Sequence, residues 1–227
     1  MIESNKGLPS GSPDIPDACR YPLDSLDRAD MAALVQGDPT ALDRIMERHS
    51  KAVFRFLYHL VGTEADAADL AQETFVRVYL NRASYRPEQV FTRWLFTIAA
   101  NLGRNLLRTR ARRPAVSLEE ESNIQGRPMH EVTPGTSISP EEQLSQAEVS
   151  QLVRTALAHL PEEMREAVVL CELEERSVAE TAEILQVPAR TVESRLYRAR
   201  QLLRERLRRA LTVPVRLPVA RPCVSKS

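Results

Sequence analysis

Several classes of protein are excluded by what this sequence lacks. Its three cysteines, Cys19, Cys171 and Cys223, are odd in number and far apart, so they predict neither a disulfide framework nor a paired-cysteine zinc site. Only seven glycines are present, and there is no glycine-rich phosphate loop, no G-x-S-x-G nucleophile motif and no H-E-x-x-H metal motif. No apolar run approaches the ~18 residues of a membrane span, and the N-terminal stretch lacks the apolar core of a secretory signal. We therefore expect a cytoplasmic protein that is not an enzyme, with no metal, no cofactor and no membrane insertion.

Aromatic residues are also few, at 5%, while leucine, alanine, arginine and glutamate are abundant, which favours helices over sheets. We expect an all-α protein of two small helical domains joined by an acidic flexible linker, the second domain ending in a helix-turn-helix. The linker carries one arginine and six glutamates, and four prolines interrupt it. The predicted parts are a mobile extension at 1–26, a first domain at 27–113, the linker at 114–143, a second domain at 144–211 and a loose tail at 212–227.

The net charge of zero hides two basic clusters, since 31 basic residues balance 31 acidic ones. Eight arginines stand against two glutamates between Arg190 and Arg209. Five more arginines close the first domain: Arg104, Arg108, Arg110, Arg112 and Arg113. Either cluster alone could be a solvated helix face, but two in matching places indicate two contacts with a polyanion.

The second domain has the pattern of a helix-turn-helix. Ser177, with Glu180 three residues later, predicts a capping box at the start of the first helix, and Pro188 breaks the chain before the second. Thr191 is expected at the start of that second helix, where its hydroxyl can cap free N–H groups. Such a motif places the start of its second helix in the DNA major groove. The residues expected there are Arg190, Thr191, Ser194, Arg195, Tyr197 and Arg198. Upstream, Cys171 falls on an apolar stripe and is expected to fill the core.

The first domain contains an acidic helix face. Asp66, Asp69 and Glu73 recur at positions i, i+3 and i+7, with Gln72 beside them, so their side chains share one side of a helix. Such a face either increases solubility or binds a basic partner.

A polar line lies on the next helix. Asn101, Asn105, Arg108 and Arg112 recur at i, i+4, i+7 and i+11, beside an apolar stripe that includes Leu95 and Leu102. An asparagine amide can both donate to and accept from a base edge, whereas arginine suits phosphate. This pattern predicts a binding surface for a single strand of nucleic acid. Trp94, the only tryptophan, could pack in the core or stack on a base.

Residues 28–209 as a whole resemble the extracytoplasmic-function group of bacterial RNA polymerase sigma factors. The stretch "LPEEMREAVVLCELEERSVAETAEILQVPARTVESRLYRARQ" resembles the fourth region of that family, and "DAADLAQETFVRVYLN" and "FTRWLFTIAANLGRNLLRTRARR" resemble its second region. The resemblance implies that the fourth region binds the minus-thirty-five element and the flap of the polymerase beta subunit. Core RNA polymerase and promoter DNA are thus implied partners, and the family commonly has an anti-sigma factor as well.

The resemblance also assigns sites in the first domain. Asp69, Gln72 and Glu73, together with Asp66, are implied to bind the coiled coil of the polymerase beta-prime subunit. The loop from Ser84 to Phe91 is implied to hold an extruded base of the minus-ten element. The residues expected at the minus-ten DNA are Ser84, Tyr85, Arg86, Asn101, Arg104, Asn105, Arg108 and Arg112.

Two residues depart from the family pattern. Glu193 stands where a cation is usual, and Gln186 stands where glycine is frequent in the turn. The main rival hypothesis is a dimeric repressor or activator with the same C-terminal DNA reader. That rival explains the helix-turn-helix but neither the acidic face nor the asparagine line of the first domain.

Overall fold

The computed structural model describes residues 23–112 and 151–212, with side chains to residue 208, and every regular element in these ranges is helical. The first domain consists of α2 (Asp24–Val35), α3 (Thr40–Val61), α4 (Glu64–Leu80), the 3-10 turn η1 (Arg82–Ser84) and α5 (Phe91–Arg112). The second consists of a helical stretch at 151–158, α7 (Glu162–Val168), the π-helix η2 (Val169–Leu173), α8 (Val178–Leu185) and α9 (Ala189–Thr212). The predicted all-α fold with two helical domains is confirmed.

The predicted extension is too long at its C-terminal end. Helix α2 begins at Asp24, so residues 24–26 form its first turn rather than part of an extension. The reason is tertiary: Asp24 Oδ1 accepts a hydrogen bond from the backbone N–H of Phe91 at 3.1 Å, at the start of α5. The rest of the extension, the acidic linker and the tail from residue 213 lie outside the described residues.

A buried polar cluster holds α2 against α3. Asp27 is fully buried, and its carboxylate lies 2.9 Å from both His49 Nε2 and Arg48 Nε. Asp30 accepts hydrogen bonds from Arg44 and Arg48 at 2.7 and 2.6 Å. Burial tends to raise the pKa of Asp30, but hydrogen bonds from Arg48 and Arg44 hold it below its usual value. Because each acid has a cationic or hydrogen-bonding partner, the cluster fixes the angle between the two helices.

Helices α3 and α5 form the centre of the first domain. Phe56 on α3 and Phe96 on α5 are fully buried and meet edge to face at 5.4 Å. At Gly103 a β-carbon would lie 2.5 Å from Leu60 Cδ2, so a larger residue at this position would require the buried side chain of Leu60 to move. The predicted stripe on α5 faces this core, with Leu95 buried completely.

The second domain has the predicted helix-turn-helix. Ser177 caps α8 in a capping box with Glu180, as predicted. Gln186 ends α8 in the left-handed conformation, with φ of 56°, which explains why glycine suits this turn. Thr191 lies in the first turn of α9, as predicted, but it does not precede the helix as a cap: α9 begins at Ala189, and the backbone N–H of Thr191 donates to Pro188 O at 2.8 Å. Pro188 directly precedes the helix, so α9 begins two residues before Thr191.

The core of the second domain lies between α7, α8 and α9. Val192, Leu196 and Ala199 of α9 are buried there together with Ala167 and Val168 of α7. Cys171 packs at the edge of this core, where its Sγ lies 3.1 Å from Thr181 Oγ1. Burial raises the pKa of the Cys171 thiol, so the group stays protonated and inert, as expected of a core residue.

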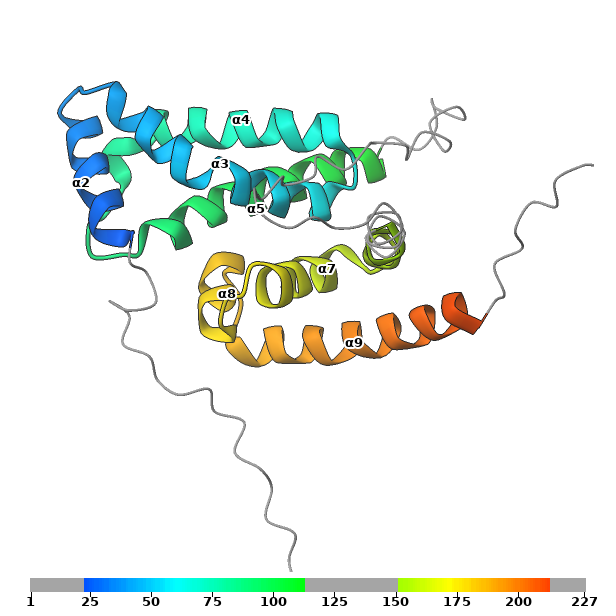
Figure 1. Cartoon of the computed structure of the whole chain (residues 1–227). Coiled ribbons are helices and arrows are strands. Elements are labelled where there is room, and N and C mark those ends of the chain that lie inside the picture. Colours follow the sequence, from blue (N-terminus) through cyan, green and yellow to red (C-terminus); the bar gives the residue numbers. More distant parts are fainter. Residues whose placement is uncertain (1–22, 113–150, 213–227) are drawn as a thin grey trace, which may run out of the picture.

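The two domains are packed against each other in layers (Figure 1). Helices α3 and α5 form the middle layer, α4 covers their far side, and the second domain covers the other side, with α8 and η2 facing α5 and α3. The long helix α9 forms the outer edge of the second domain. Within the described parts of the chain, no helix has the length and apolar character of a membrane span.

Candidate protein and nucleic-acid interfaces

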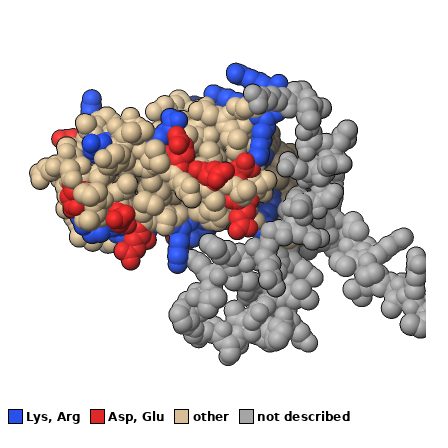
Figure 2. Space-filling view, turned by 90° about the horizontal axis from the view of Figure 1, so that it is seen from above, with Lys and Arg blue, Asp and Glu red and all other residues tan. Residues whose placement is uncertain are grey.

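The acidic face predicted on α4 lies on the outer surface of the first domain, where acidic side chains gather in Figure 2. Asp69 and Gln72 are exposed, and Glu73 is half-buried in an ion pair with Arg77 at 2.8 Å. Asp66 is engaged within the domain, because its carboxylate binds the guanidinium of Arg110 on α5. Asp69, Gln72 and Glu73 therefore share an accessible surface, and Asp66 joins α4 to α5.

An apolar end continues this acidic face along α4. Leu80 is 67% exposed and Val76 49% exposed, and both fall at helical spacing after Asp69 and Glu73. Exposed apolar side chains beside charged ones are typical of a protein-binding surface. Sequence reasoning did not identify this apolar end. The spacing could have done so, since Val76 and Leu80 lie off the buried stripe that contains Val78. We call Asp69, Gln72, Glu73, Val76 and Leu80 the α4 face.

The asparagine and arginine line on α5 is accessible along its length. Asn101, Asn105, Arg108 and Arg112 are all exposed. Arg104 is different: its guanidinium donates to Asn101 Oδ1 at 2.9 Å, and its Nε lies 3.1 Å from Glu166 Oε1 in the second domain. The structure therefore gives Arg104 a protein partner at a position predicted to bind DNA.

The loop that precedes α5 contains the remaining residues predicted at the minus-ten DNA. Ser84 and Arg86 are exposed, but Tyr85 is buried, and its hydroxyl donates to Gln89 O at 3.1 Å. Burial raises the pKa of Tyr85 to about 12, so its hydroxyl stays a donor. The ring centroid of Tyr85 lies 5.3 Å from that of Trp94, which is half-buried. Both aromatic rings thus shape the loop from inside.

The start of α9 presents most of its predicted residues to solvent. Arg190, Ser194 and Arg198 are exposed, as is Tyr197 at 65%; Thr191 is half-buried. Glu193, the departure from the family pattern, is also exposed.

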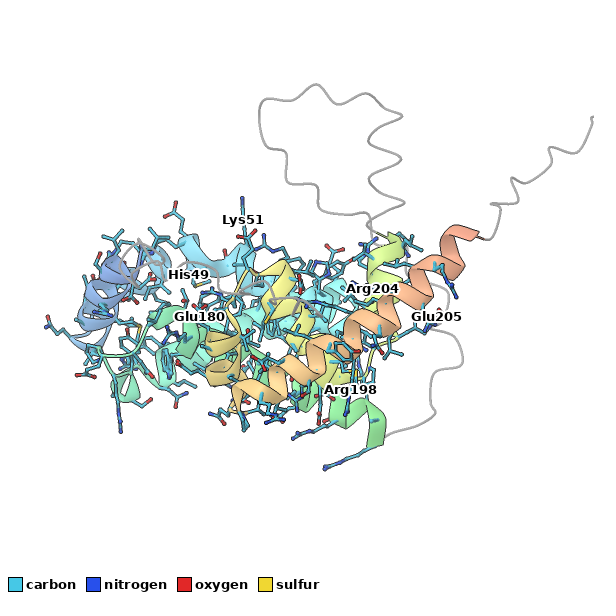
Figure 3. All side chains as sticks on the ribbon, turned by 90° about the horizontal axis from the view of Figure 1, so that it is seen from below. His49, Lys51, Glu180, Arg198, Arg204 and Glu205 are labelled. Carbon is cyan, nitrogen blue, oxygen red and sulfur yellow. The ribbon has the colours of Figure 1, made fainter. Side chains whose placement is uncertain are left out.

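Arg195 is turned toward its own domain. It pairs with Glu163 of α7 at 2.7 Å, and its side chain is 17% exposed. Figure 3 shows Arg198 and Arg204 leaving α9 on different sides. Because its partner Glu163 belongs to α7, Arg195 points away from the exposed face that Arg190, Tyr197 and Arg198 form.

An apolar groove of about 280 Å³ lies in the second domain, between residues 151–158, η2 and α9. Leu157, Leu173, Leu203 and Leu207 are among its lining residues, and Arg204 and Glu172 add charges. Grooves with an apolar lining are one of the surfaces on which proteins bind the apolar face of an amphipathic helix. Sequence reasoning missed it, because it forms only when three separate segments meet. Among the described residues no group of three or more histidine, cysteine or acidic side chains is placed to hold a metal ion.

Both domains of the chain match known protein families. Residues 45–113 match the sigma-70 region 2 family, and residues 150–203 match the sigma-70 region 4 family. The chain is 32% identical over 174 residues to the ECF RNA polymerase sigma factor SigW of Bacillus subtilis (strain 168), covering 76% of this chain and 92% of that one. It is 31% identical over 185 residues to the ECF RNA polymerase sigma-E factor of Haemophilus influenzae, covering 80% and 95%.

Two solved structures are similar in fold. One is CnrH in complex with the cytosolic domain of CnrY, with a TM-score of 0.60 and 26% identity over 81% of this chain and 97% of that one. The other is the sigma factor RpoE in complex with the anti-sigma factor NepR from Bartonella quintana, with a TM-score of 0.56 and 25% identity over 73% and 96%.

Proposed function

The chain belongs to the extracytoplasmic-function RNA polymerase sigma factors, and from this membership we propose how its surfaces divide the work of promoter-specific initiation. As a member of that family it recognises promoters, binds core RNA polymerase and starts transcription. Its relatives are transcription factors rather than enzymes. We propose accordingly that the chain has no catalytic centre and acts beside polymerase in the cytoplasm.

The α4 face is the proposed contact with the beta-prime subunit of polymerase. Its acidic end suits a basic coiled coil, because opposite charges steer the encounter and fix its register. Its apolar end, Val76 and Leu80, supplies area that becomes buried on binding. The exposure of both ends on one helix supports this role.

Helix α5 is the proposed minus-ten reader. Exposed Asn101 and Asn105 offer amides to the edge of an extruded base, and Arg108 and Arg112 continue the line toward the phosphate backbone. Flipping a base out of the duplex costs a few kcal/mol, so a fitted pocket beside these amides must compensate for it.

The exposed start of α9 is the proposed reader of the minus-thirty-five element. Arg190, Ser194, Tyr197 and Arg198 occupy the turns that a recognition helix places in the major groove. Arg195 acts more weakly in this assignment, since Glu163 already neutralises it.

The apolar groove of the second domain is the proposed binding site for the flap of the polymerase beta subunit. Leu203 and Leu207 line it on one side and Leu157 on the other, which suits the apolar face of a short helix. Two proteins of similar fold were solved with an anti-sigma factor or with a cytosolic domain of a second protein. We propose that this chain is likewise held by an anti-sigma factor.

The observation that carries the proposal is the presence of two helices with exposed arginine-bearing faces, α5 and α9, on one chain that also bears the α4 face. The test is transcription in vitro: the full chain is mixed with core polymerase and genomic DNA, and the start sites of the transcripts are sequenced. We expect starts that share a minus-ten and a minus-thirty-five sequence and that are absent with core polymerase alone. Tight binding to a DNA site without polymerase, and no new starts, would instead favour the repressor hypothesis.

A further inference from the structure

The exposed side at the start of α9 contains a single acid. Among residues 189–199, the exposed polar side chains are those of Arg190, Glu193, Ser194, Tyr197 and Arg198. Arg190 lies one turn before Glu193 and Tyr197 one turn after it, so these three side chains share one side of the helix. The surface proposed to enter the major groove therefore presents one negative charge among arginines.

The carboxylate of Glu193 is not used by the fold, whereas its two neighbours along the chain are. The hydroxyl of Ser194 donates to the backbone oxygen of Arg190 at 2.8 Å, and Arg195 pairs with Glu163 of α7 at 2.7 Å. Within the described ranges, no ion pair or hydrogen bond joins the Glu193 carboxylate to another residue, although Arg190 is only one turn away. Glu193 therefore neither stabilises the domain through its carboxylate nor orients Arg190, and its carboxylate is available to a ligand.

Few groups in the major groove can satisfy a carboxylate. An ionised carboxylate only accepts hydrogen bonds, and the phosphate oxygens, guanine N7 and O6, and thymine O4 are acceptors as well. The available donors are the amino groups at cytosine N4 and adenine N6. Adenine places the acceptor N7 beside its amino group, where it repels the second carboxylate oxygen, whereas cytosine presents its amino group alone. Cytosine is therefore the base that fits a glutamate.

The position of Glu193 along α9 suits contact with a base edge. It is the fifth residue of a helix that begins at Ala189, about 6 Å from the start. In a helix-turn-helix the N-terminal residues of the second helix contact the bases. A carboxylate that met only phosphates there would weaken binding to every sequence, because each phosphate is negative. A carboxylate that meets an amino group instead favours the sequences that supply this donor and penalises the others.

We propose that Glu193 determines promoter specificity by accepting a hydrogen bond from the N4 amino group of one cytosine in the minus-thirty-five element. Guanine and thymine at the same position place an acceptor opposite the carboxylate and are rejected. The residue adds selectivity rather than affinity, since its charge opposes the general attraction of α9 to DNA. This inference rests on the proposed role of α9 as the reader of that element.

The test is selection of duplexes by holoenzyme. Core polymerase with the full chain is mixed with duplex DNA that is randomised over the minus-thirty-five element, and the bound fraction is sequenced. We expect the wild-type chain to select cytosine at one position about tenfold over the other bases. Glu193→Arg should select guanine at that position, because arginine donates to O6 and N7. Glu193→Gln should select adenine there, because the amide pairs with N6 and N7.

A reciprocal exchange keeps the result independent of folding. Two duplexes that differ only by cytosine or guanine at the selected position are titrated with each holoenzyme, and binding is followed by fluorescence anisotropy. Wild type should prefer the first duplex and Glu193→Arg the second, each about tenfold. A variant that merely unfolds binds neither duplex and cannot reverse the preference. Equal affinity of the Glu193→Arg holoenzyme for the two duplexes would overturn the proposal.

Glu205→Arg is the matched control, since Glu205 lies on the same helix ~18 Å farther along, beyond Arg198 (Figure 3). It makes the same charge change and should tighten binding to all duplexes alike, leaving the selected bases unchanged. A wild-type preference for another base at the position that responds to Glu193 would overturn the assignment of cytosine. If Glu193→Gln and Arg190→Ala lose preference at one and the same position, Glu193 acts through Arg190 and the proposal fails.

One further variant separates this inference from the proposed role of α9. If neither the Glu193 variants nor Arg198→Ala change the selected sequence, α9 does not read the element, and both proposals fail. If Arg198→Ala changes the selected sequence and the Glu193 variants do not, α9 remains the reader and only the assignment of Glu193 is wrong.

Discussion

Arg195 and Arg198 are three residues apart on α9 but have different surroundings. Arg195 is held by Glu163 and is 17% exposed, whereas Arg198 is exposed near the start of the helix (Figure 3). An arginine that already has a carboxylate partner gains less from a phosphate or a base, because it must first give up that partner. Arg198 is therefore the proposed DNA contact of the two, and Arg195 supports the packing of α9 on α7.

We predict that Arg198→Ala weakens holoenzyme binding to the minus-thirty-five element by about 1–3 kcal/mol, the range for loss of a base contact. Arg206→Ala serves as the matched control, since Arg206 is exposed on the same helix but ~12 Å farther along. It should cost less and act mainly through the salt dependence. Fluorescence anisotropy across a salt series measures both. Equal losses for the two variants would show that α9 attracts DNA without reading it.

Gln186 adopts a backbone conformation that favours glycine, with φ of 56° at the end of α8. We predict that Gln186→Gly stabilises the protein by about 0.5–1 kcal/mol, because glycine has no β-carbon to strain this conformation. Urea unfolding measures the change. Gln201→Gly, the same substitution at an exposed position inside α9, should instead destabilise by about 1 kcal/mol. A loss of stability in both variants would contradict the explanation of the turn.

At the scale of the element, α4 carries two kinds of surface on one face. We predict that Asp69→Arg and Leu80→Ser each weaken binding to core polymerase at least about tenfold, that is ~1.4 kcal/mol. Both residues are exposed, so the free energy of unfolding should change by less than about 0.5 kcal/mol.

The control for α4 is Glu47→Arg, which reverses an exposed acid on α3. Its affinity for polymerase, measured by the same fluorescence titration, should match wild type. If Leu80→Ser binds normally while Asp69→Arg does not, the contact is electrostatic and the apolar end takes no part in it.

The helices themselves follow closely from the sequence. The apolar stripes of α5 and α9 appear at helical spacing, and the capping box at Ser177 marks the start of α8. What covers a stripe is harder to predict, because spacing identifies an apolar face but not its partner. Leu170 and Ile184 are local apolar residues whose burial depends on the other domain. Arg104 was assigned to DNA from its place among arginines, and its pairing with Glu166 depends on contacts between distant parts of the chain.

For the whole molecule, Glu166 is the group through which we expect the packing of the two domains to depend on pH, because its neighbour Arg104 belongs to the other domain. It is 2% exposed, and burial raises its pKa to about 7. Arg104 of α5 and Arg195 of α9 lower this pKa, while Glu162 and Glu163 on α7 raise it. Burial outweighs the pairing, so near neutral pH the carboxyl is protonated in a substantial fraction of closed molecules, that is, of molecules whose two domains are packed together.

We predict that the closed form loses stability as pH rises from about 4.5 to about 7. Separation of the domains returns the pKa of Glu166 toward its ordinary value of 4.5, so opening releases a proton within this window. The closure equilibrium should shift by up to about tenfold per pH unit there, and level off above it. Energy transfer between dyes attached at Ala65 on α4 and Gln201 on α9, both exposed, measures the shift. Glu166→Gln should flatten the profile, and Glu193→Gln, at an exposed site on α9, should not.

The two domains belong to one chain, and this gives closure a property that binding between separate molecules lacks. Tethered modules meet at an effective concentration in the millimolar range, which is independent of how many copies the cell contains. Doubling the amount of protein therefore doubles the closed and open forms alike and leaves their ratio unchanged. Concentration alters this ratio only through a second molecule that binds the open form more tightly than the closed form. The fraction of chains whose domains are separated is therefore independent of the abundance of the chain itself.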